Sequence, residues 1–376
     1  MTPRERVLAA CAHKEPDRVP IDFGGRVSTL HAFAERDLKR YLGLEGGDER
    51  IISWMTYTVD PDPRLVELFG RDTRPVPVRP GSRYTFRIDS ETSTYSDEWG
   101  IKYHMPPGGF YFDPCEHPLA WAEAPSDLDR FDWPDPTDPS RISGVAAALR
   151  AAREAGYATM LTAPTLGIWL LPHFLCGMER ALMDLALNRP FVEALAERLT
   201  EWYEAFWTAA LKEVGPWVDL VHMEGDLGDQ TGPLFSPKVF REIYKPRFRR
   251  IVDIIKRHSS ALLWLHSCGS VRWAIPDLID CGVDVLNPVQ VGAAGMDSAE
   301  LKRDFGRDLT FWGGGCDTKV LQFGSPAEVE AEVKQRVEDF KPGGGFVFAS
   351  IHNIQANVPP ENIVAMFDAA RTHGEY

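Results

Sequence analysis

From about residue 141 onward, two kinds of apolar segment alternate along the chain. Short runs such as 261–265 are almost continuously apolar, which predicts buried strands, whereas longer segments repeat apolar positions every three or four residues, which predicts amphipathic helices. The predicted strands of this region cover 157–164, 218–226, 261–269, 283–290, 309–317 and 344–353. They alternate with predicted helices at 142–156, 172–213, 236–258, 271–282, 297–306, 325–340 and 359–374.

The first 140 residues have a different pattern. A helix is predicted over 2–12, because Thr2 can cap it and Pro3 suits its first turn. A short strand at 18–24 and a helix at about 29–42 follow. Residues 50–140 are rich in Pro, Asp, Tyr and Trp and contain hairpin-like pieces, so they are interpreted as an irregular, antiparallel insertion and not as a separate domain.

The regular alternation of strands and helices predicts a parallel sheet. With the strand at 18–24, the predicted strands number seven to eight, which favours a (β/α)8 TIM barrel formed by residues 1–376 as one domain. The alternative is an open, doubly wound sheet. It is disfavoured because no GxGxxG sequence follows any of the predicted strands.

Soft metal ligands lie at the carboxyl ends of the predicted strands, where barrel enzymes place their functional groups. His266 and Cys268 are separated by one residue, so both can point to the same side of an extended strand. Gly269 then allows the backbone to turn close to an ion. Cys316 and His352 end two further strands. Imidazole and thiolate are the ligands that Zn²⁺ prefers.

Each of these residues also has a purely structural interpretation. A lone cysteine at a strand end is usually a small core residue, and a lone histidine there is usually a hydrogen-bonded structural one. Four such residues on three strands, all at the same rim of the barrel, favour a metal site instead.

Acidic and polar residues lie at the same predicted rim. Glu224 and Asp226 are candidate catalytic residues, because a carboxylate beside a metal can orient a ligand or act as a general base. Asn287 and Gln290 are candidates for hydrogen bonds to a substrate, and Trp169 is a candidate for lining the substrate pocket. Helix capping and core packing are the alternatives for these side chains.

Charge and composition exclude several classes of function. The formal net charge of −14 over 376 residues leaves no basic face for nucleic acid or for an anionic membrane. No apolar run is long enough to span a membrane, and no signal peptide is recognisable. Six scattered cysteines without a secretory signal predict reduced thiols in a cytoplasmic protein.

Several long segments resemble the uroporphyrinogen decarboxylase superfamily. They are "RERVLAACAHKEPDRVPID", "GDLGDQTGPLFSPKVFREIYKPRFRRI", "LHSCGSV", "IPDLIDCGVDVLNPVQ" and "HNIQANVPPENIVAMFDAAR". The resemblance covers nearly the whole chain and is weakest over residues 50–140. It implies the same (β/α)8 barrel.

Two branches of that superfamily differ in their motifs. The decarboxylases have an arginine-rich RQAGR segment after the first strand, which grips the substrate carboxylates. Here the corresponding "VPIDFGGRVS" keeps only Arg26, and no obvious replacement is visible in so acidic a chain. The zinc-dependent corrinoid methyltransferases have an HxC pair and a distant cysteine in the last barrel strand. His266 and Cys268 match the pair, whereas the distant cysteine aligns with His352, and Cys316 lies one strand earlier.

The resemblance therefore implies a zinc-dependent methyltransferase. Its Zn²⁺ would be held by His266 and Cys268 with Cys316, His352 or both. It would move a methyl group between a small methylated substrate or a thiol and a corrinoid. A separate corrinoid protein would supply the cobalamin, because this chain has no DxHxxG motif. The alternatives are a metal-free decarboxylase that relies on Asp226, and a barrel that only binds a ligand.

Overall fold

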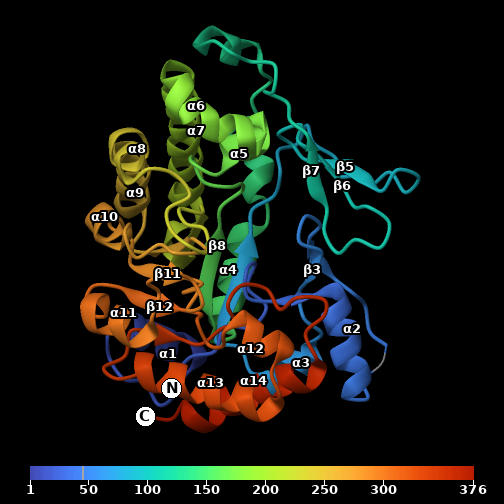
Figure 1. Cartoon of the computed structure of the whole chain (residues 1–376), viewed down its shortest axis with the longest axis vertical. Helices are drawn as coiled ribbons and strands as arrows, with labels where there is room; N and C mark the ends of the chain where they lie inside the picture. The colour runs from blue at the N-terminus through green and yellow to red at the C-terminus, as the bar shows by residue number, and fades with distance from the viewer. Residues whose placement is uncertain (45) are drawn as a thin grey trace.

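The centre of the molecule is a parallel sheet of seven strands in the order β13-β12-β11-β10-β9-β8-β4 (Figure 1). The computed structural model describes residues 1–44 and 46–376. The seven strands are β4 (Thr73–Pro77), β8 (Ala158–Thr162), β9 (Leu220–Glu224), β10 (Leu262–His266), β11 (Val285–Asn287), β12 (Thr310–Trp312) and β13 (Phe346–Val347).

The segment around Ile21 closes this sheet into a barrel. On one side, Ile21 forms a parallel bridge with Phe348, and the Asp22 N–H donates to the Phe348 carbonyl at 2.9 Å. On the other side, the Asp72 N–H donates to the Ile21 carbonyl at 2.8 Å. The segment thus occupies the position of an eighth strand between β13 and β4. The predicted (β/α)8 barrel is confirmed.

One strand of the barrel lies inside the segment that we interpret from the sequence as an insertion. Thr73–Pro77 pairs in parallel with β8 along its whole length. Pro75 and Pro77 have no N–H to donate, so prolines in such a run argue against an interior strand. This is why the sequence pattern missed β4. The insertion is therefore split in two by a barrel strand.

The remaining strands form two small antiparallel sheets outside the barrel. The first contains β1 (Leu30–His31), β3 (Thr58–Val59) and β2 (Ile51–Ser53). The second contains β5 (Thr94–Ser96), β6 (Lys102–His104) and β7 (Asp113–Glu116) and projects to one side of the molecule (Figure 1). Apart from β1, these strands lie within residues 50–140, and their pairing is antiparallel.

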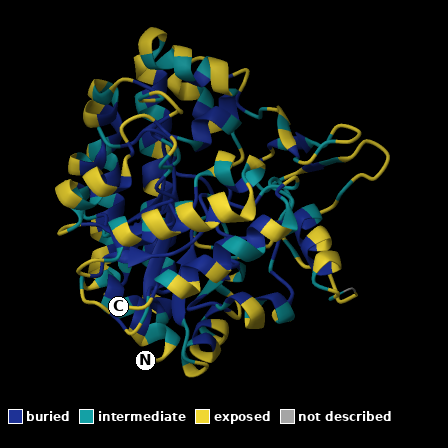
Figure 2. Ribbon diagram, turned by 60° about the horizontal axis from the view of Figure 1, so that its bottom comes forward, coloured by how far each residue is buried: buried dark blue, intermediate teal, exposed yellow. Residues whose placement is uncertain are grey.

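Helices surround the strands, with buried residues toward the centre and exposed residues outside (Figure 2). Their bounds are α1 (Pro3–Cys11), α2 (Ala32–Tyr41), α3 (Pro63–Phe69), α4 (Val145–Glu154), α5 (Leu171–Cys176), α6 (Met178–Leu187), α7 (Arg189–Val214), α8 (Pro237–Val239), α9 (Lys245–His258), α10 (Ile275–Cys281), α11 (Ser298–Phe305), α12 (Thr318–Phe323), α13 (Pro326–Phe340) and α14 (Pro360–His373). Within the described ranges, no helix combines the length and the apolar character that crossing a membrane requires.

Helix α1 seals the amino end of the barrel. It begins with a capping box between Thr2 and Glu5, which satisfies N–H groups that the first turn leaves without partners. Val7 and Ala10 of this helix pack into one buried apolar cluster with inward-facing strand residues. The strand residues of this cluster include Ala158, Met160, Leu220, Trp264, Val285, Trp312 and Val347.

The interior becomes polar toward the carboxyl end of the strands. Glu224, His266 and Asn287 lie side by side in register on β9, β10 and β11. His266 follows Trp264 by two residues, so the two side chains share a face of β10. The barrel thus has an apolar amino half and a polar carboxyl half.

Candidate metal centre

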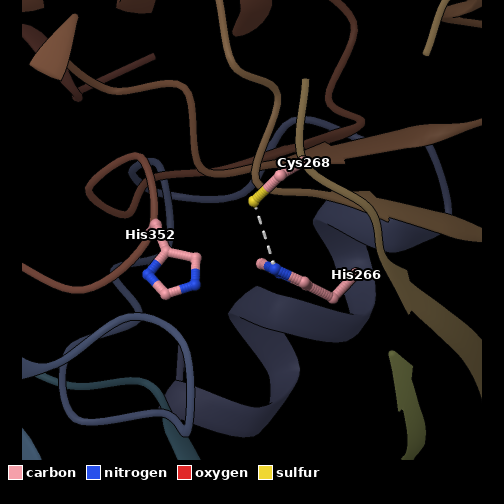
Figure 3. Close-up of side chains that lie close together, drawn as sticks. All are labelled: His266, Cys268 and His352. Carbon is pink, nitrogen blue, oxygen red and sulfur yellow. Dashed lines mark hydrogen bonds between the residues drawn. The ribbon is translucent and has the colours of Figure 1, made fainter. Parts of the chain in front are cut away.

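Three predicted ligands meet at the polar end of the barrel. One ligand atom from each of His266, Cys268 and His352 lies within 4.8 Å of the others (Figure 3). The Nε2 atom of His266 is 3.3 Å from the Sγ atom of Cys268. Ligands of one tetrahedral zinc ion, at Zn–N of about 2.1 Å and Zn–S of about 2.3 Å, are roughly 3.6 Å apart. The spacing therefore fits a shared ion.

His266 is held in the tautomer that a metal ligand needs. Asn287 donates from Nδ2 to the Trp312 carbonyl at 3.0 Å, which fixes its Oδ1 as an acceptor. The Nδ1–H group of His266 donates to that oxygen at 2.6 Å. Because Nδ1 carries the proton, the lone pair of Nε2 is directed toward Cys268 and is available to a cation.

The thiol of Cys268 depends on a cation to ionise. Burial raises its pKa well above the ordinary value, and the negative charges of Asp226 and Glu224 raise it further. In the protein alone the thiol is neutral and lies in hydrogen-bond contact with His266 Nε2. A divalent ion between the two residues would convert the neutral thiol to a thiolate, since coordination deprotonates a thiol.

The loop that presents Cys268 is fixed by hydrogen bonds from its own backbone. The Cys268 N–H donates to Asp226 Oδ1 at 2.8 Å, and the Gly269 N–H donates to Gln290 Oε1 at 2.9 Å. Gly269 has φ +82°, and a Cβ at this position would lie 2.5 Å from the Asp229 carbonyl oxygen. Only glycine fits this turn, as expected from its place after the HxC pair.

His352 differs from His266 in its hydrogen bonding. Its Nδ1 accepts the Asn353 N–H at 2.7 Å, so the proton of the neutral ring is on Nε2. Burial, together with the neighbouring His266 and against the opposing charge of Glu224, lowers its pKa to about 3. Its φ of 62° is in the left-handed region, an unusual conformation for a residue with a side chain. To bind a metal through Nε2, the ring would have to lose the proton on Nε2 and carry it on Nδ1 instead.

Cys316 is not part of this group. It is fully buried, and its thiol faces the Asp317 carbonyl oxygen at 3.6 Å. The charged groups that influence its pKa include Glu332 and Arg336 of α13, so the side chain points toward the helix layer. Of the two candidates for a third ligand, the structure brings His352 and not Cys316 to the other two.

Glu224 lies beside His266 in the sheet and forms an ion pair with Arg26. Its Oε1 atom is 2.6 Å from Arg26 Nε and 3.3 Å from His222 Nε2. Burial has the largest influence on this carboxyl and favours its neutral form, but Arg26 and the imidazoles around it outweigh burial and lower its pKa. Glu224 is therefore ionised and orients Arg26. Asp226, in contrast, accepts a hydrogen bond from the backbone N–H of Cys268.

The residues that we predicted to contact a substrate have other contacts. Asn287 is fully buried and both ends of its amide are engaged. Gln290 joins Gly269 to Gln230, whose Oε1 is 2.7 Å from Gln290 Nε2. Trp169 is only 1% exposed and packs edge-to-face against Phe240 and Phe248. Trp169 is therefore packed in the core, against a ring of helix α9.

Two arginines near the site were missed by sequence reasoning. Arg71 and Arg74 line a cavity of about 240 Å³ together with Arg26. The sequence suggested no obvious replacement for the decarboxylases' arginines, but Arg71, just before β4, and Arg74, within β4, line this cavity together with Arg26. Both arginines occur in "RDTRPVP", and recognising that run as a barrel strand would have been the signal.

Comparisons with known proteins agree with this architecture. The uroporphyrinogen decarboxylase of Thioalkalivibrio sulfidiphilus is 29% identical over 152 residues, which span 39% of this chain and 40% of that enzyme. The uroporphyrinogen decarboxylase of Citrobacter koseri is 23% identical over 76% of this chain and 78% of its own length.

Among solved structures, a methyltransferase from Methanosarcina mazei shares the fold over 99% of both chains, with a TM-score of 0.63 and 20% sequence identity. The family model for uroporphyrinogen decarboxylase (URO-D) matches residues 87–373, which is most of the chain. This chain therefore belongs to the URO-D family.

Proposed function

We propose that this chain is a zinc-dependent methyltransferase. It would move a methyl group between a small methylated substrate or a thiol and a corrinoid bound to a partner protein. The observation that carries the proposal is the meeting of His266, Cys268 and His352, with the Nε2 lone pair of His266 fixed by Asn287. A buried histidine beside a half-buried cysteine in this arrangement fits zinc better than a packing role.

The bound zinc would supply Lewis-acid chemistry, holding a thiol as thiolate or polarising the heteroatom of a methyl donor. The chain's own residues prepare the site for it. Asn287 keeps the His266 proton on Nδ1, and Asp226 holds the backbone of the Cys268 loop. Glu224 forms an ion pair with Arg26. The Methanosarcina methyltransferase supports this assignment through a shared fold along the whole chain.

A metal-free decarboxylase is the second candidate. The curated relatives are named uroporphyrinogen decarboxylase, and Arg71 and Arg74 supply cations beside Arg26 that could bind carboxylates. In that enzyme Asp226 would act without zinc. The thiol of Cys268 and the imidazole of His266 would then have no chemical role.

Metal analysis of the purified protein separates the two candidates. We expect one zinc per chain in the unaltered protein and none in His266→Ala or Cys268→Ala. Cys316→Ala is the matched control, because it removes a buried thiol outside the group and should keep its zinc. The zinc protein, but not the two zinc-free variants, should demethylate methylcobalamin with a thiol as acceptor or methylate a reduced corrinoid. Zinc-free unaltered protein that converts uroporphyrinogen would contradict the proposal and establish the decarboxylase.

A further inference from the structure

A cavity of about 250 Å³ is lined by residues of the two small sheets and of the carboxyl end of the barrel. Its walls come from β2, β5 and β6, from the residues that follow β4 and β8, and from α5. Its aromatic rings are those of Trp54, Tyr84, Phe86, Tyr95, Trp99 and Tyr103. Arg26 forms part of the wall and pairs with Glu224, the neighbour of His266 in the sheet. The cavity therefore adjoins the polar row of the barrel.

The described lining of this cavity contains three charged side chains, and two of them are already paired. Arg26 Nε is 2.6 Å from Glu224 Oε1. Glu98 accepts two hydrogen bonds from the buried guanidinium of Arg141, at 2.7 and 2.9 Å. The third, Asp97, is contacted by two backbone N–H groups and one hydroxyl, and it has no ion-pair partner in the described part of the chain. The uncompensated charge of the cavity is therefore negative.

The charge of Asp97 is more than the fold needs at this position. Its Oδ1 accepts the N–H groups of Trp99 and Ile101, at 2.9 and 3.0 Å, and thereby holds the turn between β5 and β6. Its Oδ2 accepts only the Tyr103 hydroxyl, at 3.1 Å. An asparagine would offer the turn the same oxygen without a charge. Burial raises the pKa of Asp97 to about 6, so its ionised form costs free energy that a cation in the cavity would offset.

The aromatic walls suit a cation that carries no hydrogen-bond donors. Trp54 stacks on Phe86 with ring centres 5.4 Å apart, and Tyr95 stacks on Tyr103 with ring centres 4.8 Å apart. The faces of such rings attract positive charge, and Trp does so most strongly. A primary ammonium has three N–H donors that need acceptors when it is buried, whereas a quaternary ammonium has none. Aromatic walls with a single uncompensated carboxylate therefore favour the quaternary group.

We propose that this cavity binds the quaternary ammonium group of a small molecule, with Asp97 compensating its charge and the aromatic rings contacting its methyl groups. A quaternary nitrogen has no lone pair to offer a Lewis acid, so this group serves for recognition and its methyl groups are not those that zinc would activate. The inference goes beyond the proposed function and does not depend on zinc.

Isothermal titration calorimetry of the full chain with choline tests the proposal. We expect choline to bind the unaltered protein. Neohexyl alcohol, in which carbon replaces the charged nitrogen of choline, should bind at least about tenfold more weakly, because the attraction to the carboxylate and the rings is lost. Ethanolamine should also bind at least about tenfold more weakly, because its ammonium N–H groups would lose hydrogen bonds to water.

Asp97→Asn should weaken choline binding by about tenfold or more and leave neohexyl alcohol within about twofold, because the turn is kept and the charge is removed. Asp89→Asn is the matched control. Asp89 Oδ1 likewise accepts two backbone N–H groups, in the turn that leads into β5, but the side chain is exposed and outside the cavity. This control should bind choline as the unaltered protein does. Trp54→Leu keeps an apolar wall without an aromatic face, and it should weaken choline binding by about fivefold.

The proposal is overturned by an absence of choline binding, by equal binding of choline and neohexyl alcohol, or by equal binding of choline to Asp97→Asn and to the unaltered protein. Tighter binding of ethanolamine than of choline would also overturn it. Titration of Cys268→Ala and metal analysis of each protein separate this inference from the zinc assignment. Choline binding that survives in Cys268→Ala supports the cavity site whether or not the zinc assignment holds, whereas a zinc-loaded protein that does not bind choline overturns this inference alone.

Discussion

Trp264 and His266 lie on the same face of β10, two residues apart, yet they belong to different environments. Trp264 is in the apolar cluster that α1 seals at the amino end. His266 is in the polar row with Glu224 and Asn287 at the carboxyl end. Both residues are buried, so burial alone does not distinguish the half of the barrel that stabilises the fold from the half that can perform chemistry.

The difference lies in what supports each side chain. Trp264 contacts other rings, with His222 and Trp312 at ring-centre distances of 4.5 and 6.1 Å. His266 has a hydrogen-bond partner that fixes one nitrogen and directs the other toward Cys268. A packed ring is surrounded by other side chains, whereas an imidazole that binds a metal must keep one nitrogen lone pair accessible. The predictions below test this division, beginning with the largest effect.

Replacing each member of the pair should have opposite consequences. Trp264→Ala should lower the free energy of unfolding by about 3–5 kcal/mol and keep stoichiometric zinc. His266→Ala should lose its zinc and about a thousandfold or more of methyl-transfer rate, because several kcal/mol of charge stabilisation disappear. Urea unfolding and metal analysis measure the two effects. If Trp264→Ala lost its zinc at a urea concentration at which this variant is still folded, the division between the two halves of the barrel would be wrong.

Asn287 should act on zinc through His266. Asn287→Leu removes the acceptor that keeps the proton on Nδ1, and we expect zinc affinity to fall by about 10- to 100-fold. A competing chromophoric chelator measures it. Asn362→Leu is the control, because Asn362 is an equally buried amide that binds the carbonyls of Leu321 and Gly324 outside the barrel. Equal zinc affinity in the two variants would show that Asn287 only fills space.

His352 should contribute less than His266 to zinc binding. Its Nδ1 is occupied by the Asn353 N–H, so coordination through Nε2 has to displace a hydrogen bond. We expect His352→Ala to weaken zinc binding by about tenfold or less, roughly the worth of one such bond. The same chelator competition applies. A loss as complete as that in His266→Ala would mean that the two imidazoles are equivalent ligands.

His222, at the boundary of the two halves, should make folding sensitive to acid. Burial lowers its pKa to about 3, from an ordinary value of 6.5. Between these pH values the unfolded chain therefore binds a proton at His222 that the folded chain does not bind. The free energy of unfolding that is present above about pH 6.5 is consequently lost as the pH falls toward 3. His222→Gln should reduce the slope of unfolding free energy against pH by at most about 1.4 kcal/mol per unit in this window. Urea unfolding at pH 7 and pH 5 measures the slope.

Local sequence patterns predicted most of the fold but only part of the site. The alternation after residue 141 identified six barrel strands, and the strand position around Ile21 was recognised as well. Thr73–Pro77 was missed because its prolines resemble a loop, and Arg74 was missed with it. Trp169 was assigned to a pocket because an apolar residue after a strand has the same pattern whether it faces the mouth or a covering helix.

The sequence by itself determined the barrel and the positions of His266 and Cys268, because strand periodicity sets which face a residue takes and barrel topology sets which end carries the loops. Only the tertiary structure decided that His352 and not Cys316 completes the group, that Asn287 holds the His266 proton, and that Arg71 and Arg74 stand beside Arg26. These relations join residues that are distant in the chain, and their geometry depends on how the strands close around the barrel rather than on any local pattern.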